Sequence, residues 1–259
     1  MQALDIESAR LPRGGELLGE VHVLRGKLHA HGQSLTLDML EFSSPQGAAT
    51  GRLAASLDRR EPWDVALDWN VSLPELTLAG ETRITGVLRD LALQQRFSQP
   101  AAADVSGRLR GLPDMPDWDL RLELQALPAG DNPWPDTLDG VSADLDINGS
   151  LEASRIIGDI AWPAVLDTSA AVDATLGWRD TVLVLDAVGI EFAPASRADF
   201  HGRVVPGPAP QVELRGRAAG ITWPLQGGET LATLPALEFE GRSTGSSWRL
   251  AARGEVEAT

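Results

Sequence analysis

The sequence has little of what enzymes and metal sites usually need. Its 259 residues include no cysteine, no tyrosine and only four histidines. The absence of cysteine excludes disulfides, thiolate nucleophiles and cysteine-containing zinc sites. Long apolar runs are missing as well, since no window reaches the roughly 18 consecutive apolar residues that a membrane-spanning helix needs. We therefore predict that the protein is not an enzyme and carries no metal and no cofactor.

Positive charge is also scarce. Aspartate and glutamate number 37 against 22 lysines and arginines, which gives a formal net charge of −15. Nucleic-acid binding depends on a basic surface that releases counterions from the phosphates, and an anionic membrane surface attracts basic segments in the same way. The charge balance argues against both as partners. With 43% hydrophobic residues, the chain is still expected to fold rather than remain disordered.

The first residues are not expected to form a signal peptide. Residues 1–20 lack the basic segment and the apolar run of a signal peptide. The last residues, "WRLAARGEVEAT", resemble a strand that stops in the middle of its pattern. We expect residues 1–259 to be one continuous, elongated segment excised from a longer, anchored protein.

The dominant pattern in the sequence is a strict alternation of apolar and polar residues. In "GRLRGLPDMPDWDLRLELQAL", residues 107–127, the apolar residues alternate with Asp119, Arg121 and Glu123. These apolar residues are Trp118, Leu120, Leu122 and Leu124. Successive side chains leave a strand on opposite faces, so this pattern predicts a strand with one apolar face. A similar stretch, "GRLAASLDRREPWDVALDWNV", stands at residues 51–71. The likeness predicts a repeated hairpin-like unit and an all-β fold.

The same alternation continues along the chain, for example at Leu35, Leu37 and Met39. By strand parity we predict that one set of apolar side chains shares a single face. This set comprises Leu35, Leu37, Trp63, Val65, Leu67, Trp69, Val71, Trp118, Leu120, Leu122, Leu124, Val141, Leu145, Ile147, Val212, Leu214, Trp248 and Leu250. Turn signals rich in Gly and Pro separate the strands. The Pro-rich residues 127–135 are predicted to form a long loop within one sheet.

Two motifs resemble chemical sites without meeting their requirements. "GRSTG" at residues 241–245 matches the Gly-x-Ser-x-Gly nucleophile elbow, but a strand-like segment follows and no histidine lies downstream of Ser243. "DLDINGSLEASR" at residues 144–155 begins like a calcium loop, but Arg155 stands where a bidentate glutamate is needed. We interpret the first as a Gly-rich turn and the second as a strand whose Asn148-Gly149 pair makes a turn.

The histidines offer a weak metal pattern. His29 and His31 lie two residues apart, so on a strand both imidazoles point to the same side. Zinc sites need three or four ligands, and no third ligand lies near in the sequence. We interpret both side chains as solvated.

The repeated units resemble the periplasmic repeat region of the TamB family, within the AsmA-like group of bacterial intermembrane proteins. The features that carry the likeness are the "GxL…W(D)xLxL" units at residues 51–67 and 107–122, the stretch at residues 88–111, and the "AWP" and "TWPL" endings at Trp162 and Trp223. The resemblance implies a long sheet curled into an open hydrophobic groove, the β-taco, with an apolar interior. It also implies a place in the periplasm, in a protein anchored in the inner membrane.

The same resemblance implies a function. The groove would bind phospholipid acyl chains and move phospholipids between the inner and outer membranes, with no catalytic residue. Neighbouring segments of the full-length chain and an outer-membrane TamA-like protein would be partners. The alternative is a scaffold that assists the assembly of outer-membrane β-barrel proteins or autotransporters by offering sheet edges for strand addition. A third interpretation is a secreted β-solenoid adhesin, which the presence of only three asparagines disfavours. Ordinary core packing of the tryptophans in a closed sandwich or barrel is the purely structural alternative.

Overall fold

The structure is a computed structural model that describes most of the chain. The described residues are 2–13, 16–58, 60–73, 76–130, 136–166, 169–193, 196–207, 210–225, 229–244 and 247–258. Within the strands, side chains are described from His22 onward, apart from those of Ala193 and Ala258. All regular structure in these ranges is extended, apart from one 3₁₀ turn, η1 (Asp136–Leu138). The predicted all-β fold class is confirmed.

The strands are mostly 8–16 residues long, longer than the usual five or six. Their bounds are β1 Gln2–Arg13, β2 Glu16–His31, β3 Ser34–Ser44, β4 Gly47–Ser56, β5 Pro62–Leu73, β6 Leu76–Val87, β7 Asp90–Gln99, β8 Ala103–Arg110, β9 Asp117–Leu124, β10 Ser142–Ser150, β11 Ser154–Ala161, β12 Ala170–Arg179, β13 Val182–Ala193, β14 Ser196–Val205, β15 Gln211–Trp223, β16 Ala232–Thr244, β17 Ser247–Gly254 and β18 Glu257–Ala258.

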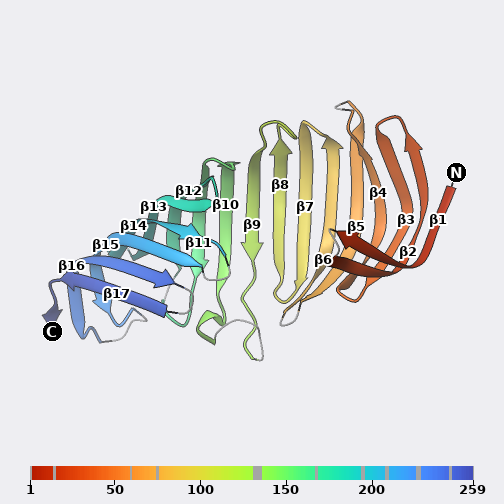
Figure 1. Cartoon of the computed structure of the whole chain (residues 1–259). Coiled ribbons are helices and arrows are strands. Elements are labelled where there is room, and N and C mark those ends of the chain that lie inside the picture. The colour runs from red at the N-terminus through yellow and green to blue at the C-terminus, as the bar shows by residue number, and fades with distance from the viewer. Residues whose placement is uncertain are drawn as a thin grey trace. The chain divides into compact units, whose positions relative to one another are not determined.

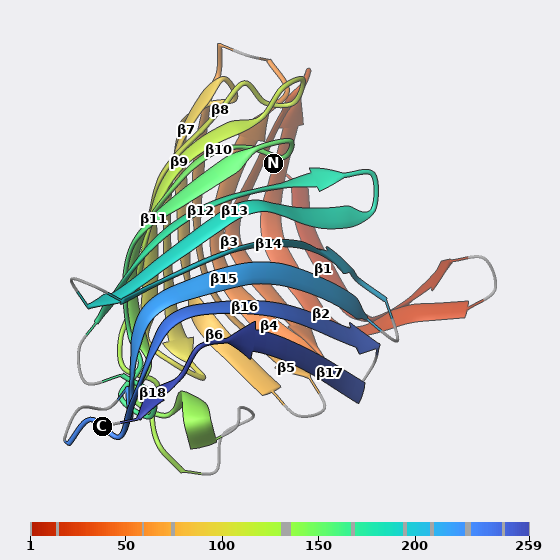
Figure 2. The same cartoon turned by 90° about the vertical axis from the view of Figure 1, so that its left-hand side faces the viewer.

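The chain divides into two compact units. The first comprises residues 1–120 and 131–133, and the second comprises residues 121–130 and 134–259. The first four residues of β9 belong to the first unit and its last four to the second. Each unit is an antiparallel meander in which consecutive strands pair (Figure 1). In the second unit the strands β12–β16 bend along their length (Figure 2).

Register places the alternating residues of the first unit on two faces. Residues directly opposite in an antiparallel pair point to the same side of the sheet. One apolar row crosses six strands, β3 to β8, through Leu37, Leu53, Val65, Ile84, Leu93 and Gly107. A second row on the same face crosses β4 to β8 through Ala49, Trp69, Gly80, Phe97 and Ala103. The residues that alternate with these positions along each strand form the other face.

The second unit repeats this arrangement over β10–β17. One row runs through Ile147, Ile156, Ala174, Val188, Phe200, Gly216, Phe239 and Ala252. Another runs through Leu145, Gly158, Val172, Ile190, Ala198, Ala218, Leu237 and Gly254. Small residues occur in both rows, which lets the larger side chains of the neighbouring strands pack over them.

Two local sequence interpretations are wrong. The pair Asn148-Gly149 lies inside β10, opposite Arg155 and Ser154 of β11, and the turn is made by residues 151–153. Met39 does not continue the alternation of Leu35 and Leu37. A bulge separates Leu37 from Leu40, and Met39 has a φ of +53° and a 62% exposed side chain. The extra residue in the bulge changes the phase of the strand, so Leu40 takes the apolar face.

The predicted loop at residues 127–135 lies in part outside the described residues. Residues 127–130 have no regular structure, and residues 131–135 are not described. The backbone amides of Leu127 and Gly140 donate to the carbonyls of Val141 and Leu127, at 2.8 and 2.9 Å. These bonds tie the start of the segment to the residues that precede β10.

Candidate functional site

The predicted apolar set is spread over both units and is mostly half-buried. Of its 18 members, 14 are half-buried, and Val65 is buried with 5% exposure. The exceptions are Leu35, Trp248 and Leu250, which are exposed. Val141 stands one residue before β10 rather than within it. The polar neighbours along the same strands, such as Asp68, are exposed, so the alternation separates a drier face from a wet one.

The apolar face of the first unit carries an aromatic pair over a glycine. Gly80 lies between Trp69 and Phe97 on adjacent strands, and the two rings meet edge to face with centroids 5.9 Å apart. A Cβ on Gly80 would stand 2.2 Å from the Arg96 carbonyl oxygen. The absence of that side chain is therefore what lets the strands and the rings approach each other.

One polar pair interrupts this face. Thr82 and Gln95 lie directly opposite each other in β6 and β7, and their side chains are hydrogen-bonded. The Trp69 indole Nε1–H donates to Thr82 Oγ1 at 2.9 Å. The pair therefore has its own partners, and it satisfies the indole N–H within a mostly apolar surface.

The second unit also has an aromatic pair beside a glycine on its apolar face. Phe200 and Phe239 flank Gly216 on adjacent strands, with ring centroids 6.4 Å apart. Both rings are half-buried. No described side chain of the second unit's apolar rows falls below 2% exposure. The face is therefore packed laterally along the sheet but is not covered by a second layer of described residues.

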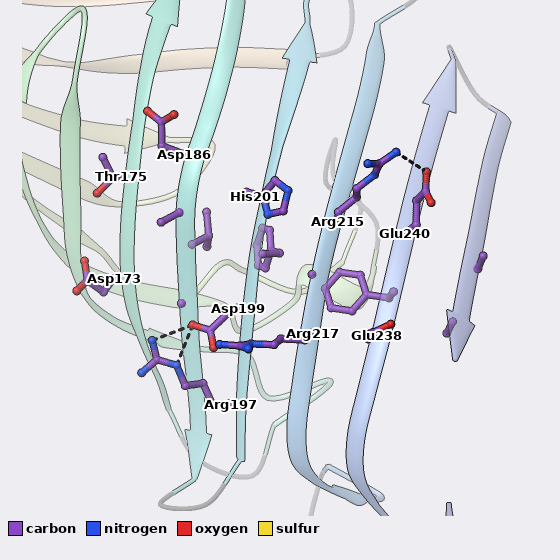
Figure 3. Close-up of a pocket in the computed structure, with 18 of the residues that line it drawn as sticks. Asp173, Thr175, Asp186, Arg197, Asp199, His201, Arg215, Arg217, Glu238 and Glu240 are labelled. Atoms are coloured by element: carbon purple, nitrogen blue, oxygen red, sulfur yellow. Dashed lines mark hydrogen bonds and ion pairs between the residues drawn. The ribbon is translucent and has the colours of Figure 1, made fainter. Parts of the chain in front are cut away.

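Charged side chains form a ladder on the opposite face of the second unit. The Arg155 Nη2 atom lies 2.7 Å from Asp173 Oδ2, Arg203 Nε lies 2.9 Å from Glu213 Oε2, and Arg215 Nη2 lies 3.3 Å from Glu240 Oε1. Figure 3 shows part of this face, with the Arg197–Asp199 and Arg215–Glu240 contacts drawn as dashed lines. The ladder is an exposed polar surface on which side chains of opposite charge on adjacent strands face each other.

A hollow of about 1300 Å³ lies across β11–β17 and is lined mostly by residues of this charged face, together with Val188, Phe200 and Phe239 of the apolar row. Sequence reasoning missed it, although the alternation of charge at Arg197, Asp199 and Arg203 was a visible signal. Five arginines and five carboxylates line it, together with His201. Because the charges are equal in number and mostly pair with one another, the hollow has no excess charge with which to select an ion, and we assign it no ligand.

Hydrogen bonds from arginines shift the titration of three carboxyls. Arg155, Arg197 and Arg203 each donate to a carboxylate and lower the pKa of Asp173, Asp199 and Glu213, respectively. Burial opposes each shift but is the smaller effect. The hydrogen bond stabilises the charged form, which is the reason for the direction.

These shifts predict an acid-dependent loss of stability. A carboxyl whose pKa is lower in the folded state stabilises the fold above its unfolded pKa, near 3.8 for aspartate, and this contribution disappears as the pH falls through the lowered value. We expect Asp173→Asn to lower the melting temperature slightly at pH 7 and to match the unmodified protein near the acid end of the titration. Thermal melts across this range, repeated at high salt, measure the effect. A difference in melting temperature between the two proteins that persists unchanged in acid contradicts this prediction.

The remaining sequence motifs are placed in strands. Ser243 is a buried residue of β16, opposite Trp248 of β17, so residues 241–244 form a strand and not a strand-to-helix elbow. Asp144 of the calcium-like segment forms an ion pair with Arg121. The Arg121 Nη2 atom lies 2.7 Å from Asp144 Oδ2. His29 and His31 are exposed residues of β2. The strand interpretation of residues 142–150 is confirmed, although its turn lies further on.

No group of three or more potential metal-ligating side chains is found among the described residues. Within the same ranges, no helix has the length and apolar character required to cross a membrane. Comparisons with protein-family models, with curated proteins and with solved structures give no match. The apolar faces and the sequence resemblance are therefore the observations that bear on function.

Proposed function

We propose that the apolar faces of the two units bind phospholipid acyl chains. In this proposal the chain is part of a groove that moves phospholipids between the bacterial inner and outer membranes without a chemical step. The observation that carries it is the half-buried state of 14 of the 18 predicted apolar residues, which leaves apolar surface open to a ligand. The resemblance to the TamB family supplies the periplasmic location and the anchor in the inner membrane.

The rows of apolar side chains suit an extended hydrocarbon. Each row crosses successive strands, which lie about 4.8 Å apart, so a chain laid along a row meets one residue per strand. Removing a methylene from water is worth about 0.8 kcal/mol. If the open face covers about half of each methylene, then a chain of about 16 methylenes gains roughly 6 kcal/mol. This gain is enough for binding and small enough to permit release.

The charged faces fit the same proposal. They keep the face opposite the apolar rows hydrated, because ion pairs such as Arg155–Asp173 and Arg203–Glu213 remain exposed to water. A phospholipid whose acyl chains lie on the apolar face would keep its head group in solvent. An outer-membrane TamA-like protein belongs to the proposal only through the family resemblance, and none of the residues described above is assigned to that contact.

Site-specific photo-crosslinking tests the proposal. Leu67 and Asp68 are consecutive residues in β5 that point to opposite faces. We expect a photoreactive residue at position 67 to capture phospholipid in cells, and one at position 68 to capture little, with mass spectrometry of the adduct as the measurement. Equal capture at both positions, or capture only of protein at position 67, contradicts lipid binding on the apolar face.

A further inference from the structure

Thr82 and Gln95 are the polar members of an otherwise apolar row in the first unit. The row crosses β5 to β8, with Leu67 opposite Thr82 and Val105 opposite Gln95. All four side chains are half-buried. The strands that carry the pair, β6 and β7, are each paired on both sides (Figure 1). The surroundings of the pair are therefore set by neighbouring strands of the same unit.

A chain of hydrogen bonds fixes the orientation of the Gln95 amide. The Trp69 indole N–H donates to Thr82 Oγ1 at 2.9 Å, and the Thr82 hydroxyl is hydrogen-bonded to Gln95 Oε1. A carbonyl oxygen can only accept, so the hydroxyl is the donor in this second bond. The amide oxygen of Gln95 therefore faces Thr82, and the amide nitrogen Nε2 points away from the hydroxyl.

The Gln95 amide nitrogen has one N–H more than its protein partners use. Nε2 donates to the Arg96 carbonyl oxygen at 3.3 Å, and a carboxamide nitrogen carries two hydrogens. No second acceptor lies within hydrogen-bond distance of Nε2 in the described part of the chain. The bond that Oε1 accepts from Thr82 polarises the amide, which makes the remaining N–H a stronger donor.

The same amide nitrogen lies beside the aromatic pair of the apolar face. A Cβ on Gly80 would stand 3.2 Å from Gln95 Nε2, so a side chain at this position would cover the nitrogen. Gly80 lies between Trp69 and Phe97, whose ring centroids are 5.9 Å apart. A ligand that follows the apolar rows would therefore meet a single N–H donor bordered by hydrocarbon and aromatic surface.

The packing of Trp69 does not by itself require Gln95. Thr82 alone accepts the indole hydrogen, and its half-buried hydroxyl could donate to water instead of to Gln95. An apolar residue at position 95 would extend the apolar row, whereas glutamine adds a polar group and loses more side-chain entropy when it is ordered. A ligand acceptor for the remaining N–H gives the glutamine a role that the fold alone does not.

We propose that Gln95 Nε2 donates a hydrogen bond to the ester carbonyl of an acyl lipid. This inference rests on the proposed function, because it requires acyl chains on the apolar face. An ester carbonyl is an acceptor joined directly to a hydrocarbon chain, so it can reach the amide while the chain lies on Leu67 and Val105. The bond would hold the glycerol end of the lipid at β6 and β7, and it would favour ester-linked chains over ether-linked chains, which lack the carbonyl.

Calorimetric titration of the whole chain with two short-chain lipids tests the role of Gln95. The probes are dioctanoyl phosphatidylcholine and its dioctyl ether analogue, which has no carbonyl, both below their micelle concentrations. They share the head group and have closely similar chains, so the ratio of their dissociation constants reports mainly on the carbonyl. The net contribution of one neutral hydrogen bond corresponds to about a fivefold change in affinity. We therefore expect Gln95→Leu to shift this ratio about fivefold in favour of the ether lipid.

Gln94→Leu is the matched control for this substitution. Gln94 precedes Gln95 in β7 but is exposed on the opposite face, across from Arg83 and Ser106. We expect this variant to leave the ratio unchanged. Gln95→Glu is a second variant, which keeps an acceptor for the Thr82 hydroxyl and replaces the N–H donor by an oxygen. It should shift the ratio in the same direction as Gln95→Leu, by about fivefold or more, because that oxygen repels the carbonyl.

The proposed function and the role of Gln95 fail in different ways. Thermal melts first verify that each variant is folded. If the unmodified chain binds neither lipid, lipid binding by the apolar face is contradicted, and the role of Gln95 is contradicted with it. If both lipids bind but Gln95→Leu and Gln95→Glu leave the ratio unchanged, or Gln94→Leu changes it equally, only the role of Gln95 is overturned.

Discussion

Gly158→Ala is expected to lower the free energy of unfolding by about 2–5 kcal/mol. Gly158 lies in β11 between Leu145 and Val172 and has a φ of +154°, a conformation that residues with a Cβ rarely adopt. A Cβ there would stand 1.9 Å from the Asp144 carbonyl oxygen and 2.9 Å from the Leu145 Cα. Both atoms are backbone, so the neighbouring strand itself has to move, and denaturant unfolding measures the cost.

Gly241→Ala is the matched control. Gly241 is also an interior glycine on the apolar face, between Leu214 and Leu250. A Cβ there would meet Leu250 Cδ1 at 3.7 Å and Leu214 Cβ at 4.0 Å, which is ordinary contact. We expect this variant to be unchanged or stabilised by up to about 1 kcal/mol. Equal losses in the two variants would show that the close strand approach at Gly158 is not the cause.

Val65→Asp is expected to destabilise the protein by about 3–5 kcal/mol at neutral pH. Val65 is 5% exposed and lies between Leu53 and Ile84 on the apolar face of the first unit. A carboxylate at this position loses its hydration without gaining an ion pair. Desolvation would raise the pKa of the new carboxyl above its unfolded value, so stability should recover as the pH falls toward that unfolded value. Urea unfolding at several pH values provides the measurement.

Leu250→Asp is the corresponding control on the same kind of face. Leu250 is 74% exposed on β17, so a carboxylate there keeps most of its water. We expect a change within about 0.5 kcal/mol. A large loss at Leu250, or no loss at Val65, would contradict the burial pattern of the apolar faces. Together the two variants separate the packed part of the face from its open edge.

Strand parity was predictable because it depends on neighbouring residues alone. Trp63, Val65, Leu67 and Trp69 alternate with polar residues, and any strand through them has one apolar face. The antiparallel register places Val65 opposite Leu53 and Ile84, and Trp69 opposite Ala49 and Gly80, as alternation requires. The meander was predictable as well, because the intervening Gly- and Pro-rich segments are too short to cross to a distant strand.

Positions of turns and bulges were less predictable. Asn148-Gly149 is a common hairpin-turn pair, yet the pairing of β10 with β11 carries both residues into the strand. Met39 is apolar and in phase with Leu37, yet the bulge in β3 leaves it exposed. In both cases pairing with the adjacent strands overrides the local preference, since a shift of one residue would reverse the face of every following side chain.

The sequence by itself determined that the chain is all-β, that one face of each strand is apolar, and which residues share that face, because these properties follow from the two-residue period of a strand. Only the tertiary structure decided how deeply each member is covered. Val65 has strands paired on both sides and is buried, whereas Trp248 and Leu250 lie on β17 and are exposed. The same pairing placed Arg249 opposite Arg242 and not opposite an acid. Burial and charge pairing depend on which strands lie alongside, and a side chain's own position in the sequence does not specify its neighbours across the sheet.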